Sequence, residues 1–468
     1  MQHFFAIAIL TASAAAVAAA ADKPLRAGFA EADVTPEVGI GRNVYLAGYG
    51  HNRKATGVHD PIMARAVVLA DGEKKIALVS IDVVGLMHPT TLAIRDELKD
   101  FAYVMVSSTH NHEGPDTVGI WGSSPFSGGL DPVYLRRLIK GAVNAVRDAE
   151  KQLVAVDAAF GTAEDESLLG DSRLPKAYDS VLRVLKFTRR DDGRLAGLLV
   201  QWNCHPEAMG SRNTQVTADF PAFTVAWLKK RYDCPVAYFT GTVGGLLAPP
   251  GGDVIKDDDG RALRRGTFEY TIRYGEAVGR LAEKAVEAAK PVALTPFAVS
   301  TRTIAIPLFN PIYRLYQSLG VIQRPGCEWT GDPEKPGERL ERPVEGKETA
   351  VESEVACLRL GEVDIACIPG EIYPELVYGK FQEPAEPAAD FPDAPLEKPV
   401  AAIMPHEKWL LFGLANDELG YIIPKRQWDQ KAPFAYGRKT SQYGEINSVG
   451  PEAAAIIMRA LERRVNEL

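Results

Sequence analysis

Two histidines one residue apart are the residues in this sequence whose types and spacing most readily suggest chemistry. His110 and His112 stand in "VMVSSTHNHEGPDT", residues 104–117, at the end of an apolar run in a chain with eight histidines. On an extended backbone, side chains two residues apart point the same way. Such a pair can act together on a metal ion or a substrate, whereas a single histidine at a strand end more often only forms a structural hydrogen bond.

Other ligand-type residues also follow strand-like runs. His205 comes directly after "GLLVQWNC", Glu371 after "VDIACIPG", and Tyr421 after "WLLFGLANDELG". Loops beyond strand ends are where α/β proteins gather their ligands. Two histidines and a glutamate from separate loops form a catalytic zinc set, although the same ligands also suit iron or manganese. Spacing alone leaves a metal site and ordinary strand-end residues equally open, and His88 and His406 are taken as hydrogen-bonded residues.

The elements that must position these residues alternate between strands and helices. Short apolar runs predict buried strands within residues 65–71, 75–84, 101–109, 197–204, 235–241, 363–370 and 409–417. Amphipathic patterns predict helices within residues 131–153, 218–232, 271–290 and 450–468. This alternation predicts an α/β fold, mixed α+β in detail, around a mixed sheet with the site in loops at the strand C-terminal ends. Residues 323–350 and 382–399 are rich in proline and charge and are expected to be surface excursions.

Composition limits the classes of function. The chain has 468 residues, 46% of them hydrophobic, and a net charge of −8, which argues against a nucleic-acid partner. Residues 1–21 are apolar and alanine-rich and are interpreted as a signal peptide, so we expect an exported protein, periplasmic or secreted. No later stretch is expected to span a membrane, and residues 22–468 are expected to form a single domain. Five cysteines without a C-x-x-C motif require no disulfide framework in a chain of this size, and the sequence leaves open whether an exported protein forms one bridge and between which residues.

Common catalytic motifs do not fit the sequence. It has no H-E-x-x-H, no G-x-S-x-G nucleophile elbow and no G-x-x-x-x-G-K-[ST]. "THNHEGPD" is close to the T-H-x-H-x-D-H motif of metallo-β-lactamase-like hydrolases, but Gly114 stands where that motif needs its third histidine. We therefore reject that assignment.

Six motifs in a fixed order resemble the neutral/alkaline non-lysosomal ceramidase family. They are "ADVTPEVG…LAGYG", "GVHDPIMARAVVL", "VSSTHNHEGPD", "NCHPEAMG", "IPGEIYPE" and "NDELGY…YGEINSVGPEAA". The resemblance is to the N-terminal catalytic domain of the family, and it covers nearly the whole chain after the signal peptide. It implies a ceramidase-like fold and the hydrolysis of a linear amide C–N bond.

The resemblance also assigns roles to residues of this chain. It implies one Zn²⁺ per chain with four ligands, one from each of four motifs: His110, His205, Glu371 and Tyr421. It implies three catalytic residues: His112, Arg173 and Tyr443. In that arrangement zinc would activate a water molecule and polarise the amide oxygen. His112 would touch that water or the carbonyl, while Arg173 and Tyr443 would stabilise the oxyanion or donate a proton.

The sequence departs from the family pattern at three points. Ala248 stands where the family carries a serine beside the metal, which leaves a zinc–water mechanism but no serine-dependent one. Glu113 replaces a serine in the H-x-H motif, and we expect it to be a salt-bridge partner rather than an added base. No counterpart of the family's smaller C-terminal β-sandwich domain is expected. These departures leave open whether ceramide itself is the substrate.

The sequence therefore predicts an exported zinc-dependent hydrolase of N-acylated, ceramide-like lipids, with a place in sphingolipid metabolism. We expect a small-molecule or lipid substrate and peripheral contact with lipid, and no nucleic-acid partner. Two alternatives stay open: a zinc hydrolase of a non-ceramide ester or amide, and a non-catalytic binding protein that kept the fold. The sequence leaves the acyl chain, the head group and the oligomeric state open.

Overall fold

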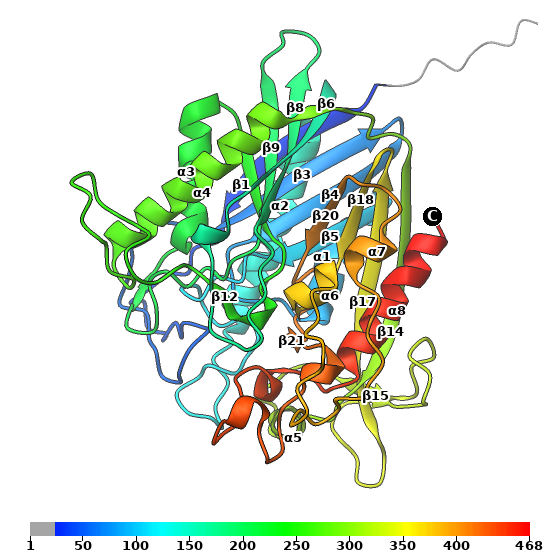
Figure 1. Cartoon of the computed structure of the whole chain (residues 1–468). Helices are drawn as coiled ribbons and strands as arrows, with labels where there is room; N and C mark the ends of the chain where they lie inside the picture. The colour runs from blue at the N-terminus through cyan, green and yellow to red at the C-terminus, as the bar shows by residue number, and fades with distance from the viewer. Residues whose placement is uncertain (1–23) are drawn as a thin grey trace, which may run out of the picture.

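The protein is described here by a computed structural model covering residues 24–468, so the expected signal peptide lies outside the described residues. Two mixed β-sheets face each other, and helices cover the outer face of each (Figure 1). The predicted mixed α/β fold is confirmed, with two sheets where one was expected. Within residues 24–468, no helix combines the length and the hydrophobicity needed to cross a membrane.

The larger sheet carries the first half of the chain. Across the sheet its strands are β11 (Val236–Thr240), β9 (Leu195–Trp202), β8 (Val181–Arg189), β6 (Val154–Glu164), β1 (Arg26–Asp33), β3 (Met63–Asp71), β4 (Lys74–Ile81) and β5 (Tyr103–Ser108), with β13 (Lys290–Val292) paired to β6. Only the β4–β5 and β9–β11 pairs are parallel. Successive side chains alternate between faces, so Leu69 packs between the sheets while Val68 packs under helices. Apolar residues on both faces explain why these runs read as continuous hydrophobic segments.

The smaller sheet carries the second half. Its strands are β16 (Arg339–Leu340), β15 (Gly326–Glu328), β17 (Thr349–Leu360), β18 (Val363–Cys367) and β20 (Trp409–Phe412), with β14 (Phe297–Pro307) paired to β17. Leu358 of β17 packs between the sheets, whereas Val355 packs toward the C-terminal helix. Each sheet thus buries one face against the other sheet and one face under helices. The sequence analysis predicted β18 and β20 but missed β14 and β17, and it treated residues 323–350, which contain β15 and β16, as irregular.

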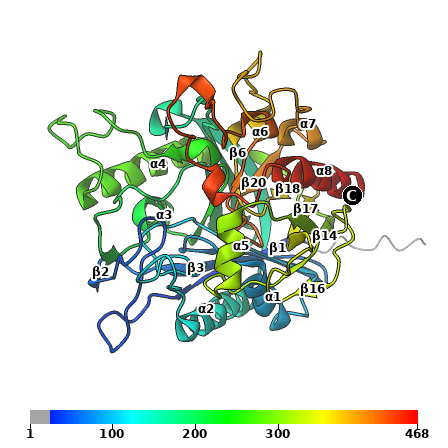
Figure 2. The same ribbon diagram turned by 90° about the horizontal axis from the view of Figure 1, so that it is seen from below.

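The helices divide between the two outer faces (Figure 1). Those on the larger sheet are α1 (His88–Asp96), α2 (Pro132–Lys151), α3 (Asp219–Tyr232) and α4 (Phe268–Ala288); those on the smaller sheet are α6 (Pro374–Tyr378), α7 (Val400–Ile403) and α8 (Ala453–Asn466). Helix α2 begins where expected, because Asp131 caps it and Pro132 occupies its first position. A further short helix, α5 (Pro311–Ser318), crosses the end of the molecule that Figure 2 faces.

Very short strands connect the loops at this end of the molecule. They form three pairs: β2 (Gly57–Val58) with β10 (Gln215–Val216), β7 (Gly170–Asp171) with β12 (Leu247–Ala248), and β19 (Glu371–Ile372) with β21 (Tyr421–Ile422). Because β5, β9, β18 and β20 all lead into this region, the predicted placement of the candidate residues beyond strand C-terminal ends agrees with the structure.

A buried ion pair fixes the loop that follows β20. Arg324 donates two hydrogen bonds to the carboxylate of Asp417, and both side chains are at most 1% exposed. The same carboxylate accepts the backbone N–H of His88 at 2.8 Å and the hydroxyl of Ser353 at 2.6 Å. Asp417 therefore ties its loop to α1, to β17 and to the segment after α5.

Replacing Arg324 by methionine leaves Asp417 charged and buried without its cation. We expect the free energy of unfolding to fall by about 3–5 kcal/mol, measured by urea denaturation. The matched control is Arg339→Met, which removes an exposed pair with Glu341 and should change that free energy by less than about 1 kcal/mol. Equal losses in the two variants would contradict this role for Arg324.

A second buried carboxyl makes stability depend on pH. Glu375 in α6 accepts one hydrogen bond, from Gln427 at 2.8 Å, and its other oxygen is buried without a partner among the described residues. Burial raises the pKa of Glu375 to about 7, although the Gln427 hydrogen bond lowers it. Between pH 4.5, the ordinary pKa of glutamate, and pH 7, the folded chain keeps a proton that the unfolded chain has lost.

The wild type should therefore lose stability, relative to Glu375→Gln, as pH rises through that window, and the difference should level off above it. The full change is about 3 kcal/mol for a shift of this size. Urea denaturation of both proteins at intervals from pH 4.5 to 8 measures it. A difference between the two proteins that stays constant with pH would show that Glu375 is ionised throughout.

Candidate metal and active site

His110 is held with one ring nitrogen facing the cavity. It lies just beyond β5 with a positive φ of 66°, an uncommon conformation for a residue with a side chain. Its Nδ1 donates a hydrogen bond to the carbonyl oxygen of Val84 at 2.6 Å. A backbone partner on Nδ1 fixes the tautomer and the ring orientation, as in histidines that bind metals through Nε2. The local strain thus supports an orientation that function can use.

His205 is held in the same way from a different strand. It follows β9, and its backbone N–H and its Nδ1 both donate to the carbonyl oxygen of Leu247, at 2.9 and 2.7 Å. Its Nε2 therefore also faces inward. The two histidines, predicted from separate loops, lie with their ring centroids 4.8 Å apart.

Glu371 and Tyr421 are brought together by strand register. In the parallel pair β19–β21, Glu371 is the direct partner of Tyr421. Oε2 of Glu371 lies 3.0 Å from Nε2 of His205 and 3.3 Å from Nε2 of His110. The hydroxyl oxygen of Tyr421 lies 3.5 Å from Nε2 of His205. The structure thus brings together the four residues that the sequence resemblance assigned to a metal.

The chemistry of this donor set fits a divalent cation. With Nδ1 of His110 and of His205 donating to carbonyls, Nε2 of each ring is the atom that faces the carboxylate of Glu371 and that would offer its lone pair to a cation. Lone pairs and a carboxylate this close together repel unless protons or a cation lie among them. Nitrogen and oxygen ligands of this kind are those of zinc sites. The ring nitrogens of His110, His112 and His205 also lie within 4.8 Å of one another, as a metal site requires.

Burial and neighbouring charges set the protonation of the site. Burial alone would raise the pKa of Glu371, but the charges and hydrogen bonds of His110 and His205 lower it to about 2. Burial opposes the charged form of His205, yet its contact with Glu371 raises the pKa of His205. Burial, and then the charges of His110 and His205, hold the pKa of His112 well below its usual range. His112 is therefore a neutral imidazole.

His112 is the histidine with free ring nitrogens. Both are buried and have no hydrogen-bond partner among the described residues, and the ring packs edge-on against Tyr49 at 5.1 Å between centroids. Gly48 has a positive φ of 91° and lies so close to this ring that a Cβ there would come within 2.4 Å of Cγ of His112. A side chain is therefore excluded at position 48, and the ring keeps two unused polar atoms beside the other histidines.

Arg173 and Tyr443 are placed differently from each other. Tyr443 lines the cavity, and Asn447 donates a hydrogen bond to its hydroxyl oxygen. Arg173 is not among the residues of the described chain that line the cavity. Its guanidinium is buried, pairs in bidentate fashion with Glu445 at 2.7 and 2.9 Å, and donates to the backbone carbonyls of Tyr443 and Gln427. Arg173 thus positions the segment that carries Tyr443, and this geometry differs from the direct oxyanion contact that the sequence led us to expect.

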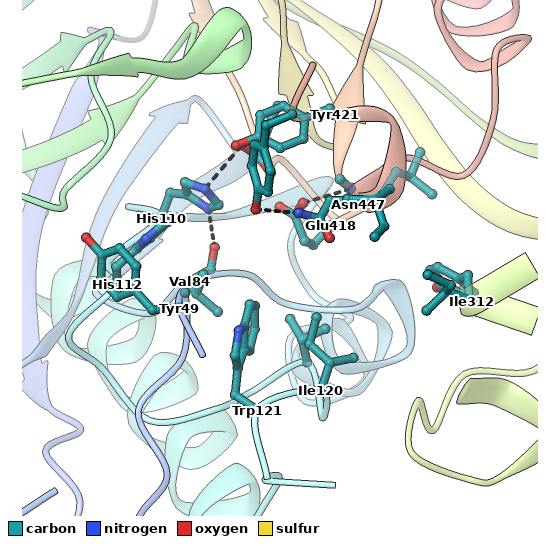
Figure 3. Close-up of a pocket in the computed structure, with 18 of the residues that line it drawn as sticks. Tyr49, Val84, His110, His112, Ile120, Trp121, Ile312, Glu418, Tyr421 and Asn447 are labelled. Atoms are coloured by element: carbon teal, nitrogen blue, oxygen red, sulfur yellow. Dashed lines mark hydrogen bonds and ion pairs between the residues drawn. The ribbon is translucent and has the colours of Figure 1, made fainter. Parts of the chain in front are cut away.

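A cavity of about 710 Å³ opens in front of these residues (Figure 3). Its inner end is polar, and Figure 3 shows His110, His112, Tyr421 and Glu418 around it. Its remaining wall is mainly apolar or aromatic: Val84, Met87, Val118, Ile120, Trp121, Leu246, Ile312, Tyr313, Tyr316, Ile322, Leu419 and Ile446. Pockets of this size and polarity typically bind small molecules or lipid chains.

Several lining residues carried no signal in the sequence. Glu207 accepts a hydrogen bond from Arg265 at 2.9 Å and lies 3.9 Å from Nδ1 of His112. Glu418 lines the cavity near His110, and α5 contributes three of the apolar residues. Spacing could not reveal them, because each comes from a loop whose position depends on tertiary packing. Glu207 and Glu418 stood inside quoted motifs, "NCHPEAMG" and "NDELGY", but neither was given a role.

The remaining expectations concern residues near the site. Glu113 pairs with Arg53 at 3.1 Å, which confirms the salt-bridge interpretation. Ala248 lies in β12 and does not line the cavity in the described structure, whereas Leu246, two residues earlier, does. His88 and His406 are hydrogen-bonded, to Asn416 and Asp364, as expected for structural histidines.

Comparisons with known proteins agree with this geometry. The family described as "Neutral/alkaline non-lysosomal ceramidase, N-terminal" matches residues 25–234, which confirms the resemblance recognised in the sequence. A neutral ceramidase from Pseudomonas aeruginosa shares the fold with a TM-score of 0.71 at 17% identity, over 95% of this chain and 74% of that chain. A ceramidase complexed with C2 matches with a TM-score of 0.67 at 17% identity, over 95% of this chain and 75% of that one. At this identity the two structures establish the shared fold.

The metal site is tested most directly by metal content. We expect the purified protein to contain about one zinc ion per chain, and His205→Ala to lose it, because removing one nitrogen ligand weakens a site of this type strongly. Mass spectrometry of the intact protein after dialysis measures the content. His406→Ala is the matched control and should keep its metal, since His406 pairs with Asp364 and does not line the cavity. Full metal content in His205→Ala would show that this assignment is wrong.

Proposed function

Because residues 25–234 match the ceramidase family and the fold of neutral ceramidases extends over 95% of the chain, we propose that this protein is an exported, zinc-dependent amide hydrolase acting on an N-acylated, ceramide-like lipid. The observation that carries the proposal is the convergence of Nε2 of His110, Nε2 of His205 and the Glu371 carboxylate at the polar end of an apolar cavity.

His110, His205, Glu371 and Tyr421 would hold the ion. Tyr421 is the least usual ligand of the four, and burial raises the pKa of its hydroxyl well above the ordinary value, so a nearby cation is needed to favour the phenolate. When bound, zinc supplies Lewis acidity, which polarises a carbonyl group and acidifies water. The reaction adds one water molecule across the C–N bond, so that the acyl carbon gains the oxygen and the amine nitrogen gains a proton.

Two residues can handle the substrate's charge and protons. His112 is neutral with both ring nitrogens free, so one nitrogen can donate a hydrogen bond to the carbonyl oxygen as negative charge develops there. Tyr443 accepts a hydrogen bond from Asn447, so its own O–H proton remains available to the leaving amine. Arg173 and Glu445 hold the backbone of the segment that presents Tyr443.

The apolar wall supports a lipid over a small polar substrate. Ile312, Tyr313 and Tyr316 of α5 line the cavity, while Leu315 of the same helix and the following Leu319 are exposed beside it. A polar, open pocket would have favoured the alternative of a non-lipid ester or amide. The exposed apolar side chains on α5 also suit peripheral contact with a lipid surface.

Hydrolysis of N-acylated lipids in detergent micelles tests the proposal. The zinc-loaded protein should release free fatty acid from an N-acyl amino alcohol, and removing the metal with a chelator should abolish release until zinc is restored. Faster cleavage of short water-soluble esters than of any N-acyl lipid would favour the alternative hydrolase. Full metal loading without cleavage of any ester or amide would favour a binding protein.

Tyr443→Phe removes the proposed proton donor and keeps the ring. We expect kcat to fall by about 100-fold or more with little change in KM, because the lost contact acts on the departing amine. Steady-state kinetics on the same N-acyl amino alcohol measure the change. Tyr436→Phe is the matched control, since its hydroxyl contacts Gln382 away from the cavity. An unchanged kcat in Tyr443→Phe would exclude this role.

A further inference from the structure

One buried carboxyl in the cavity wall has no use in the chemistry described above. Glu418 lines the cavity and is 8% exposed. Its Oε1 accepts the backbone N–H of Gly420 at 2.8 Å, while its Oε2 is buried without a hydrogen-bond partner among the described residues. Leaving a buried acceptor unpaired costs about 1–3 kcal/mol, so such an atom at a site calls for a partner.

The other cavity carboxylates already have partners. Glu371 lies against His110 and His205, and Glu207 accepts a hydrogen bond from Arg265. In the described chain, Glu418 forms no salt bridge. The carboxyl of Glu418 is thus the acidic group of the cavity that still has an unused acceptor.

Buried hydrogen bonds fix the backbone of the segment that leads to Glu418. The backbone N–H of Glu418 donates to Asp417, the residue paired with Arg324. Asn416 has a positive φ of 67°, and its side-chain oxygen accepts the backbone N–H of Val106 at 3.1 Å. Several buried contacts thus hold the loop of residues 416–418 in one conformation, as is common where a side chain must be presented in one orientation.

A glycine provides the space for this carboxyl. A Cβ added at Gly85 would lie 2.6 Å from Cγ of Glu418 and 2.9 Å from its Cβ. The φ of Gly85 is outside the left-handed region, so backbone conformation does not demand glycine there. Glycine is required at position 85 because the side chain of Glu418 packs directly against it.

We propose that Glu418 is a specificity-determining residue that accepts a hydrogen bond from an O–H or N–H group of the substrate beside the scissile bond. This inference rests on the proposed function. The acyl chain of an N-acylated lipid carries no donor, so the donor belongs to the amine portion or to the amide itself. Figure 3 places Glu418 on the side of His110 away from His112, so the donor would be bound on the opposite side of the metal ligands from His112.

Three matched substrates separate the sources of the donor. N-dodecanoyl ethanolamine carries both an amide N–H and a hydroxyl. N-dodecanoyl propylamine replaces the hydroxyl by a methyl group, and the ethylene glycol monoester of dodecanoic acid replaces the N–H by oxygen. The readout is the ratio of kcat/KM between substrates within each variant, because such ratios are insensitive to partial loss of metal or folded protein.

We expect Glu418→Leu to reduce the preference for a donor-bearing substrate by about 3–10-fold, the size of one hydrogen bond between uncharged groups. A collapse of the ethanolamine-to-propylamine ratio identifies a hydroxyl donor, and a collapse of the amide-to-ester ratio identifies the N–H. Glu418→Gln keeps an acceptor oxygen and should lose less. Gly85→Ala should shift the same ratio, because the new methyl group displaces the carboxyl.

Glu397→Leu is the matched control. Glu397 is also a buried glutamate with one oxygen on a backbone N–H, that of Lys425, and one without a partner, but it does not line the cavity. Its substitution should leave both ratios unchanged. Ratios in Glu418→Leu that stay within about twofold of the wild type overturn the inference.

Failure of the proposed function gives a different result. If the metal-loaded wild type cleaves none of the three compounds, the hydrolase proposal fails, and calorimetric binding of the ethanolamine and propylamine amides replaces kinetics. Weaker binding of the ethanolamine amide alone in Glu418→Leu then still supports the acceptor role. Equal weakening of both amides, with unchanged affinity for the ester measured in the same way, identifies the N–H as the donor. Equal weakening of all three compounds, unchanged affinity, or no binding by the wild type overturns the inference.

Discussion

The close approach of three electron-rich groups is the constraint on which the rest of this structure depends. Nε2 of His205 and Nε2 of His110 lie 3.0 and 3.3 Å from the carboxylate of Glu371, an arrangement that is unfavourable unless positive charge lies among them. The fold supplies the positions rather than the charge. Val84 and Leu247 orient the rings, and the β19–β21 register sets the carboxylate. The proposed metal completes the arrangement, and the apolar cavity in front of it defines what can reach it.

How much of the fold the sequence could predict depended on the burial of each strand. Residues 65–71 form β3, whose two faces are both covered, so the run is continuously apolar and was recognised. Strand β14, "FAVSTRTIAIP", exposes part of one face and interleaves serine, threonine and arginine, so it gave no clear period. Helix α5 spans only eight residues, too few for a helical pattern to stand out. Strand β17, "TAVESEVACLRL", likewise interleaves polar and charged residues with apolar ones. The second sheet was therefore not recognised as separate, although β18 and β20 were predicted, since its long central pair is β14–β17.

The candidate site was predictable where it followed local sequence and not where it depended on tertiary packing. His110, His205 and Glu371 each follow an apolar strand, and that placement drew attention to them. Their joint role came from the family resemblance, because no spacing indicates that residue 371 pairs with residue 421. Arg173 was expected to contact the oxyanion, yet Glu445 and two backbone carbonyls occupy its guanidinium. The environment of Glu418 also depends on tertiary packing, since Gly85, more than 300 residues earlier in the chain, packs against its side chain.

The ligands come from both sheets, and this has a consequence for the order of events in folding. His110 and His205 follow strands of the larger sheet, whereas Glu371 and Tyr421 follow strands of the smaller one. The complete ligand set therefore does not exist until the two halves of the chain have folded and docked. Binding of the proposed metal would therefore be a late step, coupled to the closure of the sheet interface. An unfolded chain carries no finished site, so the proposed metal would be acquired in the compartment where the chain folds.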